Sequence, residues 1–160
     1  MKIDTTKILT TEEIRSVIAH LKTKRRYINN RQAIVIFRLA SCCGLRASEI
    51  CGLTIDDVRT EGKRPHLRIR KTVGKGGKAR KVPLWWDQGT LDDLRSWREE
   101  QVKRGATFFV CAQSVDAFGN QLDRRTIRRI FKRCCDVLEG REDATVHDGR
   151  HSFVSLALAG

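Results

Sequence analysis

Near its start the chain shows a hydrophobic pattern of helical period. Apolar residues recur three or four positions apart, at Ile14, Val17, Ile18 and Leu21. Glu13 stands three positions after Thr10, which is the spacing of a capping box. The pattern therefore predicts a helix that starts at Thr10 and buries one face.

The next apolar stretch covers more than one face of a helix. Its members are Ala33, Ile34, Ile36, Phe37, Leu39 and Ala40. Such a surface is typical of a helix in the middle of a core. Gly44 follows at a position that favours a helix C-cap. A short helix is expected after it, with Arg46 in its first turn and Ile50 and Leu53 turned inward.

Between residues 55 and 82 the hydrophobic period changes from helical to alternating. Leu67, Ile69 and Val73 alternate with Arg68 and Arg70, which indicates a half-exposed strand. A glycine-rich turn over residues 73–79 follows, and residues 80–84 return along the first strand. The sequence therefore predicts a β-hairpin.

Two further helices are predicted in the second half of the chain. The first runs from about Thr90 to Arg104, with an inner stripe of Leu91, Leu94 and Trp97. Trp85 and Trp86 precede it, and core or rim packing is favoured for these tryptophans over base stacking. Asp123 caps the second helix, which is expected to continue to Gly140. Residues 108–110 predict a short buried strand or turn between the two helices.

The last pattern is a helix start at Thr145, which Asp148 follows three positions later. His147 and Arg150 are three residues apart and so project from one face, with His151 within one turn of His147. Free N–H groups and a guanidinium that point the same way can bind an anion. This stretch therefore predicts an anion site.

These elements predict an α+β fold that is mostly α-helical with a small antiparallel β-sheet. The chain has 160 residues, the size of one domain with a core of its own. It shows no internal repeat and contains two prolines. A single domain over residues 1–160 is therefore expected.

Charge narrows the choice of partner. The chain has 32 Lys and Arg against 19 Asp and Glu, a formal net charge of +13. Nucleic acid is the first candidate partner and an anionic membrane surface the second. No apolar run approaches the roughly 18 residues of a membrane span, and no signal-peptide pattern opens the sequence. Six cysteines in no disulfide-like spacing favour reduced thiols, so a cytoplasmic protein is expected.

Basic residues gather on the hairpin and on the helix after Asp123. No acidic residue lies between Lys63 and Lys81, although mixed signs would serve solubility better. On the helix, like charges on neighbouring ridges repel, which a polyanion would relieve. A solvated basic face is the alternative interpretation. The predicted DNA-binding residues are Arg68, Arg70, Lys78, Arg80, Arg124, Arg128, Lys132 and His151.

Four residues carry candidate phosphate chemistry: Arg46, Lys75, His147 and Arg150. Two guanidiniums can clamp one phosphate and stabilise a five-coordinate transition state. A lysine on a glycine turn can protonate a leaving oxygen, and a histidine can move a proton on the other side. No metal is needed, and the spacing of His147 and His151 matches no usual zinc site. For Arg46, an ion pair with Glu49 is the alternative.

Several segments resemble motifs of the tyrosine recombinases, the phage-integrase family. Residues 44–50, with Leu53 and Asp56, resemble the first arginine motif. Residues 73–84 resemble the β-hairpin lysine motif, and residues 147–153 resemble the His-x-x-Arg-His motif. Residues 9–13 resemble the usual opening of the catalytic domain. The match covers nearly the whole chain in the family's order, and it implies the fold of a DNA breaking-rejoining enzyme.

The resemblance also implies a function, site-specific recombination of double-stranded DNA. Arg46 and Arg150 would bind the scissile phosphate, Lys75 would be the general acid for the 5′-oxygen, and His147 would assist proton transfer. Lys78 is the competing choice for the hairpin lysine. A tyrosine attacks the phosphate to give a 3′-phosphotyrosyl link, which a second strand's hydroxyl reverses, with no cofactor or metal. The family assembles as tetramers on DNA.

The sequence departs from the family at two points. Gly149 stands where the family usually has leucine, which predicts a loose helix start. The single tyrosine, Tyr27, lies in no motif, whereas the family's nucleophile follows the position of Arg150. The resemblance thus implies part of a catalytic domain that lacks the N-terminal DNA-clamping domain and the C-terminal tyrosine segment. The 160-residue chain alone is expected to be inactive and monomeric. A truncated, inactive relative is the alternative.

Two other classes of function remain open from the residues alone. One is a non-catalytic basic module that binds DNA or RNA and keeps the phosphate pocket. The other is a metal-independent phosphodiesterase in which His147 or His151 activates water.

Overall fold

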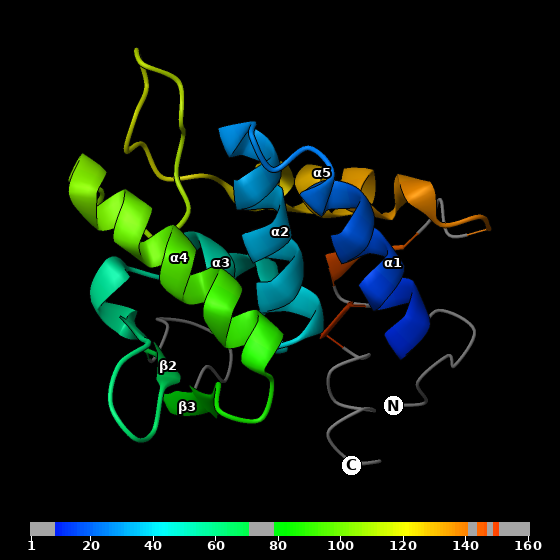
Figure 1. Cartoon of the computed structure of the whole chain (residues 1–160). Helices are drawn as coiled ribbons and strands as arrows, with labels where there is room; N and C mark the ends of the chain where they lie inside the picture. Colours follow the sequence, from blue (N-terminus) through cyan, green and yellow to red (C-terminus); the bar gives the residue numbers. More distant parts are fainter. Residues whose placement is uncertain (1–8, 71–78, 141–143, 147–148, 151–160) are drawn as a thin grey trace. The chain divides into compact units, whose positions relative to one another are not determined.

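The computed structural model describes residues 9–70, 79–140, 144–146 and 149–150 (Figure 1). The helices are α1 (Thr11–Lys22), α2 (Ile28–Ser41), α3 (Ala47–Gly52), α4 (Gln88–Arg104) and α5 (Arg124–Cys134), with 3₁₀ turns η2 (Ile55–Asp57) and η3 (Cys135–Val137). The strands are β1 (Val58–Arg59), β2 (His66–Ile69) and β3 (Arg80–Pro83). The predicted α+β class, mostly helical with a small antiparallel sheet, is confirmed.

The chain divides into two compact units, and each is described by itself. The first unit combines residues 1–51 with residues 122–160, and the second unit is the intervening segment 52–121. That the whole chain acts as one domain stays a prediction.

Helix α2 forms the centre of the first unit. Its residues from Gln32 to Ser41 are buried on all sides, as the apolar pattern predicts. It packs against α1 and α5, and the rings of Phe37 and Phe131 stack with centroids 5.3 Å apart. Burial of two aromatic rings is among the larger contributions that a small core receives. These contacts hold α5 against the core.

Helix α1 begins as the sequence predicts. The Thr10 side chain accepts a hydrogen bond from the Glu13 N–H at 3.0 Å, and the Glu13 carboxylate accepts one from the Thr10 N–H at 2.9 Å. This reciprocal capping box satisfies two N–H groups that the helix itself leaves without partners. Ile14, Val17 and Ile18 are buried on its inner face.

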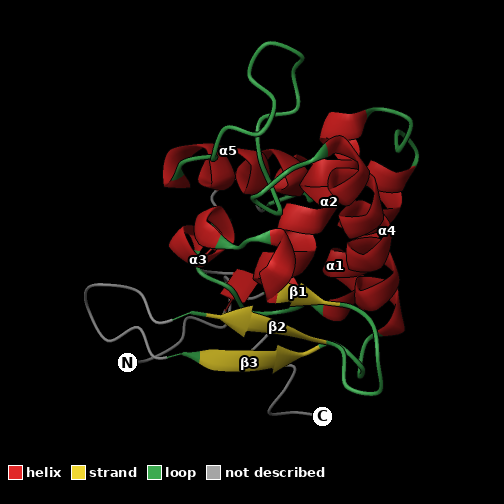
Figure 2. Cartoon of the chain, turned by 90° about the vertical axis from the view of Figure 1, so that its left-hand side faces the viewer, coloured by secondary structure: helices red, strands yellow, loops and turns green. Residues whose placement is uncertain are grey.

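The second unit contains a three-stranded antiparallel sheet in the order β1-β2-β3 (Figure 2). Leu67 on β2 pairs with Val58 on β1 and with Val82 on β3, and all three are buried. The pairing of β2 with β3 confirms the predicted hairpin. The two-residue strand β1 is an addition that the sequence pattern did not indicate. The turn over residues 71–78 lies outside the described residues.

Helix α4 also belongs to the second unit, and it starts at the N-cap Asp87. Its predicted inner stripe is buried, and the Trp97 indole N–H donates a 2.7 Å hydrogen bond to the Phe109 carbonyl. For the other two tryptophans core or rim packing is expected, and their exposure excludes the core. Trp85 is 55% exposed and Trp86 49% exposed, because they follow β3 at the point where the chain leaves the sheet.

Helix α5 ends earlier than predicted. It stops at Cys134, and the 3₁₀ turn η3 replaces the expected continuation toward Gly140. Cys135 and Leu138 stay buried because the tighter turn still directs them inward. All six cysteines are buried and none forms a disulfide, as expected for reduced core thiols. Within the described ranges, no helix is long and apolar enough to cross a membrane.

Candidate functional site

The candidate site begins where α2 turns into α3. Gly44 has a φ of +73°, in the left-handed region that favours glycine, and the Leu45 N–H donates to the Leu39 carbonyl at 3.0 Å. Helix α2 nevertheless ends earlier than predicted, at Ser41 with Cys42 as its C-cap, and Gly44 turns the chain two positions later. The turn places Arg46 immediately before the first residue of α3.

Glu49 caps α3 through the backbone of Arg46. The Arg46 N–H donates a 2.8 Å hydrogen bond to the Glu49 carboxylate. The Arg46 side chain is exposed, and its guanidinium has no hydrogen bond or ion pair within the described residues. The alternative of an Arg46–Glu49 ion pair is therefore wrong, because the contact is made by the main chain and leaves the guanidinium available.

Arg150 is fastened to the same turn from the far end of the sequence. Its Nε donates a 3.0 Å hydrogen bond to the carbonyl of Gly44, across 106 positions of sequence. One residue earlier, the Gly149 N–H donates to the Thr145 carbonyl at 3.0 Å, which is the first turn of the helix predicted at Thr145. The Gly44 turn thus locates both arginines of the predicted phosphate clamp.

Gly149 is buried and leaves no room for a side chain. A Cβ built at this position would lie 2.8 Å from Cζ of Phe131 and 3.0 Å from Oγ of Ser41. A leucine, the usual residue of the family, would overlap the Phe131 ring. The glycine therefore has a steric reason: it lets the segment that carries Arg150 approach α5 and α2.

A single open pocket of the first unit collects the candidate arginines. Its volume is about 260 Å³, and it is lined by Arg46, Ala47, Ser48, Arg124, Arg128, Val146 and Arg150. Two of these arginines come from the predicted clamp and two from the basic ridge of α5. No carboxylate is among these lining residues. The pocket is therefore strongly electropositive.

The arrangement suits a phosphate. Guanidinium groups bind phosphate oxygens through paired N–H donors, and they stay charged at any physiological pH. Several of them around one small pocket can also stabilise the extra charge of a five-coordinate phosphorus, and the bond from Arg150 to the Gly44 carbonyl fixes one of them before a ligand arrives. The chemistry that the pocket supports is phosphate binding and phosphoryl transfer.

The Cys51 thiol, which interacts with Arg124 and Arg128 of the pocket, is chemically inert. Burial raises the pKa of the Cys51 thiol to about 11, and the Asp123 carboxylate raises it further, while Arg124 and Arg128 lower it less. The thiol therefore stays protonated near neutral pH and offers no nucleophile. Asp123 itself caps α5, and hydrogen bonds from the backbone and side chain of Thr126 hold its own pKa below the ordinary value.

Four predicted site residues lie outside the described residues: Lys75, Lys78, His147 and His151. Their roles stay predictions. Lys132, the third member of the predicted ridge, is exposed on α5 and does not line the pocket. In the part of the chain that the structure describes, no group of His, Cys, Asp and Glu side chains could hold a metal ion.

The second unit carries the other predicted basic surface, on the sheet. Arg68 lies on β2 and Arg70 directly follows the strand, and the alternation puts both on the face opposite to the buried Leu67 and Ile69. Lys81 pairs with Arg68 and is exposed on that same face. We call these three residues the basic face of the sheet.

Arg80 lies differently from the other predicted hairpin residues. It pairs with Ile69, so its side chain belongs to the opposite face of the sheet. The alternation of residues 80–84 could have separated Arg80 from Lys81, which sequence reasoning did not select. DNA contact by Arg80 stays a prediction.

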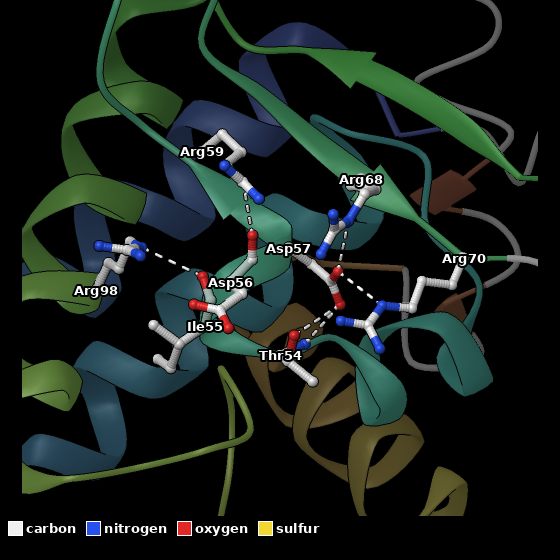
Figure 3. Close-up of polar contacts among 8 residues, drawn as sticks. All are labelled: Thr54, Ile55, Asp56, Asp57, Arg59, Arg68, Arg70 and Arg98. Carbon is white, nitrogen blue, oxygen red and sulfur yellow. Dashed lines mark hydrogen bonds and ion pairs between the residues drawn. The ribbon is translucent and has the colours of Figure 1, made fainter.

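A buried carboxylate lies next to the basic face. Asp57 accepts hydrogen bonds from Nε of Arg68 at 3.1 Å and from Nε of Arg70 at 3.0 Å (Figure 3). Burial by itself raises the pKa of Asp57, but hydrogen bonds from the Thr54 backbone and hydroxyl and from both arginines outweigh it, so that the pKa lies below its ordinary value. No sequence signal identified Asp57 as a partner of these arginines.

The known proteins to which this chain is similar include tyrosine recombinases. Curated relatives include the tyrosine recombinase XerC of Corynebacterium efficiens, 32% identical over 130 residues that cover 81% of this chain and 39% of the relative. XerC of Mycobacterium tuberculosis is 32% identical over 131 residues, which cover 79% of this chain and 40% of the relative. The chain thus spans about 40% of the length of these relatives.

Solved structures show the same fold. A crystal structure of XerA recombinase matches with a TM-score of 0.75 at 19% identity, and the match covers 99% of this chain and 50% of that one. XerH site-specific recombinase in a pre-cleavage complex matches with a TM-score of 0.71 at 22% identity, covering 96% of this chain and 43% of that one. The phage integrase family itself matches residues 7–159. The chain therefore belongs to the phage integrase family.

Proposed function

We propose that the chain is the phosphate-binding part of a catalytic domain that cleaves and rejoins double-stranded DNA in site-specific recombination. One observation carries the proposal: Arg46 and Arg150, remote in sequence, line one pocket, with Arg150 bonded to the turn that precedes Arg46. The similarity to XerC recombinases supports the same conclusion.

In this proposal the pocket residues divide the work of the reaction. Arg46 and Arg150 hold the non-bridging oxygens of the scissile phosphate and stabilise its transition state. Arg124 and Arg128, which line the same pocket, bind the DNA backbone beside it. Lys75 protonates the 5′-oxygen, and His147 assists proton transfer.

The attacking group is a tyrosine. It forms a bond from its oxygen to the phosphorus while the bond to the 5′-oxygen breaks, giving a 3′-phosphotyrosyl link and a free 5′-hydroxyl. The hydroxyl of a second strand then reverses the step, so that the bond energy is conserved without a nucleotide cofactor or a metal. We propose that this tyrosine lies in a segment after Gly160, as the family order implies.

Double-stranded DNA is the proposed partner. XerH has been solved bound to its difH substrate, and the Tn1549 transposon integrase, with a TM-score of 0.63 to this chain at 23% identity, in complex with transposon right end DNA. The net charge of +13 and the two basic sites fit a polyanion. Assembly of the whole protein as a tetramer on DNA, a monomeric 160-residue chain and a cytoplasmic location stay predictions.

Covalent capture tests the proposal. Phosphorothiolate-substituted duplexes tiled over the DNA that flanks the gene are incubated with the 160-residue chain and with a longer protein that continues through its natural reading frame. We expect duplex binding by both proteins and a covalent adduct with the longer one only. Alanine at Arg46 or Arg150 should abolish that adduct.

Two results would overturn the proposal in favour of another class. Metal-independent hydrolysis of DNA by the 160-residue chain would identify a phosphodiesterase. Duplex binding without any adduct from the longer protein would identify a non-catalytic binding module. Failure of both proteins to bind duplex DNA would exclude the proposed partner altogether.

A further inference from the structure

The Asp57 carboxylate accepts hydrogen bonds on both of its oxygens. The Thr54 N–H and hydroxyl donate to Oδ2 at 3.0 Å and 2.9 Å, and Nε of Arg68 and of Arg70 donate to Oδ1 (Figure 3). A carboxylate offers about four acceptor sites, so none is left over. Its side chain is 2% exposed. Asp57 is therefore a fixed, buried anchor and has no free oxygen for a ligand.

The two arginines are used only in part. Each donates through Nε, and the terminal nitrogens of both have no hydrogen bond within the described residues. The Arg68 side chain is 41% exposed and that of Arg70 is 59% exposed. Because both Nε atoms bond the same oxygen, the two guanidiniums are neighbours. Their terminal N–H groups remain available to an acceptor.

This arrangement differs from two free surface arginines. Adjacent guanidiniums repel each other in the absence of a counter-charge, and the Asp57 carboxylate supplies one. A free arginine also loses side-chain entropy when it binds a phosphate, whereas a side chain that is already held loses less. Asp57 lowers the net charge of the arginine pair by one unit but fixes the direction of both guanidiniums.

We propose that Asp57 is a positioning residue for DNA binding, which holds Arg68 and Arg70 by their Nε atoms so that their terminal N–H groups bind phosphates of the DNA backbone. Lys81 extends the same face beside Arg68. The inference rests on the proposed function, that the chain binds duplex DNA, and adds to it a residue of the opposite charge.

A charge-conserving substitution tests the role of the held guanidiniums. R68K/R70K keeps both charges but removes both Nε donors and the planar fork. Affinity of the 160-residue chain for a labelled duplex is measured by fluorescence anisotropy across a salt series. We expect roughly tenfold weaker binding with an unchanged salt slope, because the number of charges is the same. The matched control R15K/R25K, which changes two exposed arginines of the first unit, should bind like the unmodified chain.

For substitution of Asp57, the positioning role and simple charge counting predict opposite changes in DNA affinity. D57N removes one negative charge beside the DNA, which by itself would tighten binding. Positioning predicts weaker binding, because the amide cannot accept from both arginines and Thr54 together. NMR of the Arg68 and Arg70 Nε–H groups provides a readout independent of DNA: slow exchange in the unmodified chain should become fast in D57N.

The outcomes separate this inference from the proposed function. No binding of the unmodified chain to any duplex would overturn both. Binding of the unmodified chain, with R68K/R70K equally tight or D57N tighter, would overturn the positioning role alone. Should D57N not fold, R68K/R70K decides the matter, because its substitutions lie at partly exposed positions of the sheet face.

Discussion

The pocket of the first unit and the basic face of the second unit both gather arginines, but they hold them with different partners. In the pocket, Arg150 is fastened by a neutral carbonyl, and no carboxylate is among the lining residues. On the sheet, Arg68 and Arg70 share the buried carboxylate of Asp57. The Gly44 carbonyl brings no counter-charge of its own to the arginine that it holds, whereas the Asp57 carboxylate lowers the net charge of the arginine pair that it holds.

This difference fits two kinds of task. A group that must stabilise a transition state needs as much undiminished charge as the fold can hold in place. A group that binds the DNA backbone needs correctly oriented N–H donors, because many other charges contribute to the same binding. Under the proposed function we therefore expect the pocket to serve the chemistry and the sheet to bind the DNA backbone, so that substitutions in the two regions should have different effects.

The largest effect is expected from the clamp. In the longer, tyrosine-bearing protein, R46A or R150A should lower the rate of DNA cleavage by roughly 10³-fold, because a transition-state charge loses its partner. Lysine at either position should recover little, since it lacks the two-pronged donor. Single-turnover cleavage assays measure the rate, and anisotropy measures binding, which should weaken far less. Equal losses in binding and cleavage would contradict a catalytic role of the pocket that is distinct from DNA binding.

The close packing behind the pocket is the next test. G149A should lower the free energy of unfolding by about 1–3 kcal/mol, because the added methyl group meets the Phe131 ring and the Ser41 hydroxyl. G52A is the matched control, since nothing lies within 4 Å of a Cβ at Gly52, and it should be neutral or slightly stabilising. Chemical denaturation measures both. An unchanged stability of G149A would contradict the steric reason for this glycine.

The carboxylate anchor should show in the pH dependence of stability. The native pKa of Asp57 is lowered, so the unfolded chain takes up the proton first. The contribution of Asp57 is therefore present above its ordinary pKa of 3.8 and is lost as the pH falls through the lower native value. D57N should cost roughly 2 kcal/mol at pH 7, with a smaller difference below about pH 4.

Urea denaturation over a pH series provides the measurement for Asp57. D56N is the matched control, because the neighbouring Asp56 side chain is exposed, and it should change neither the stability nor its pH profile. A D57N chain with the same acid response as the unmodified chain would show that another group governs that response.

The smallest expected effect is on DNA affinity, when arginines of α5 that line the pocket are compared with arginines of α5 that do not. R124Q/R128Q should weaken duplex binding about tenfold near 0.1 M salt and reduce the salt slope by about 2. R125Q/R129Q removes the same charge from exposed residues that do not line the pocket, and it should weaken binding less. Equal losses in the two variants would indicate that α5 acts only through its total charge.

Much of this arrangement was predictable from local sequence. The Thr10 capping box, the buried α2 and the N-cap Asp123 each depend on residues within a few positions of one another. Arg46 and Arg150 were identified by motifs that are equally local. The strand β1 was not, because two residues are too few to show an alternating pattern.

The contacts that complete the two sites depend on long-range packing. The bond from Arg150 to the Gly44 carbonyl involves a main-chain group, which every residue has and no pattern distinguishes. Asp57 meets Arg68 and Arg70 only because the strand pairing brings β2 beside η2. The steric role of Gly149 likewise depends on the position of Phe131. Propensity indicates none of these, since each partner lies far away in sequence.

The bond between Arg150 and the Gly44 carbonyl also has a consequence for biosynthesis. Arg46 leaves the ribosome about a hundred residues before Arg150, which at 5–20 residues per second is roughly 5–20 s. During that interval the growing polypeptide contains Arg46 but not yet Arg150. A nascent or prematurely released product therefore cannot engage nucleic acid through both arginines, and this competence arises only at the end of translation of this segment.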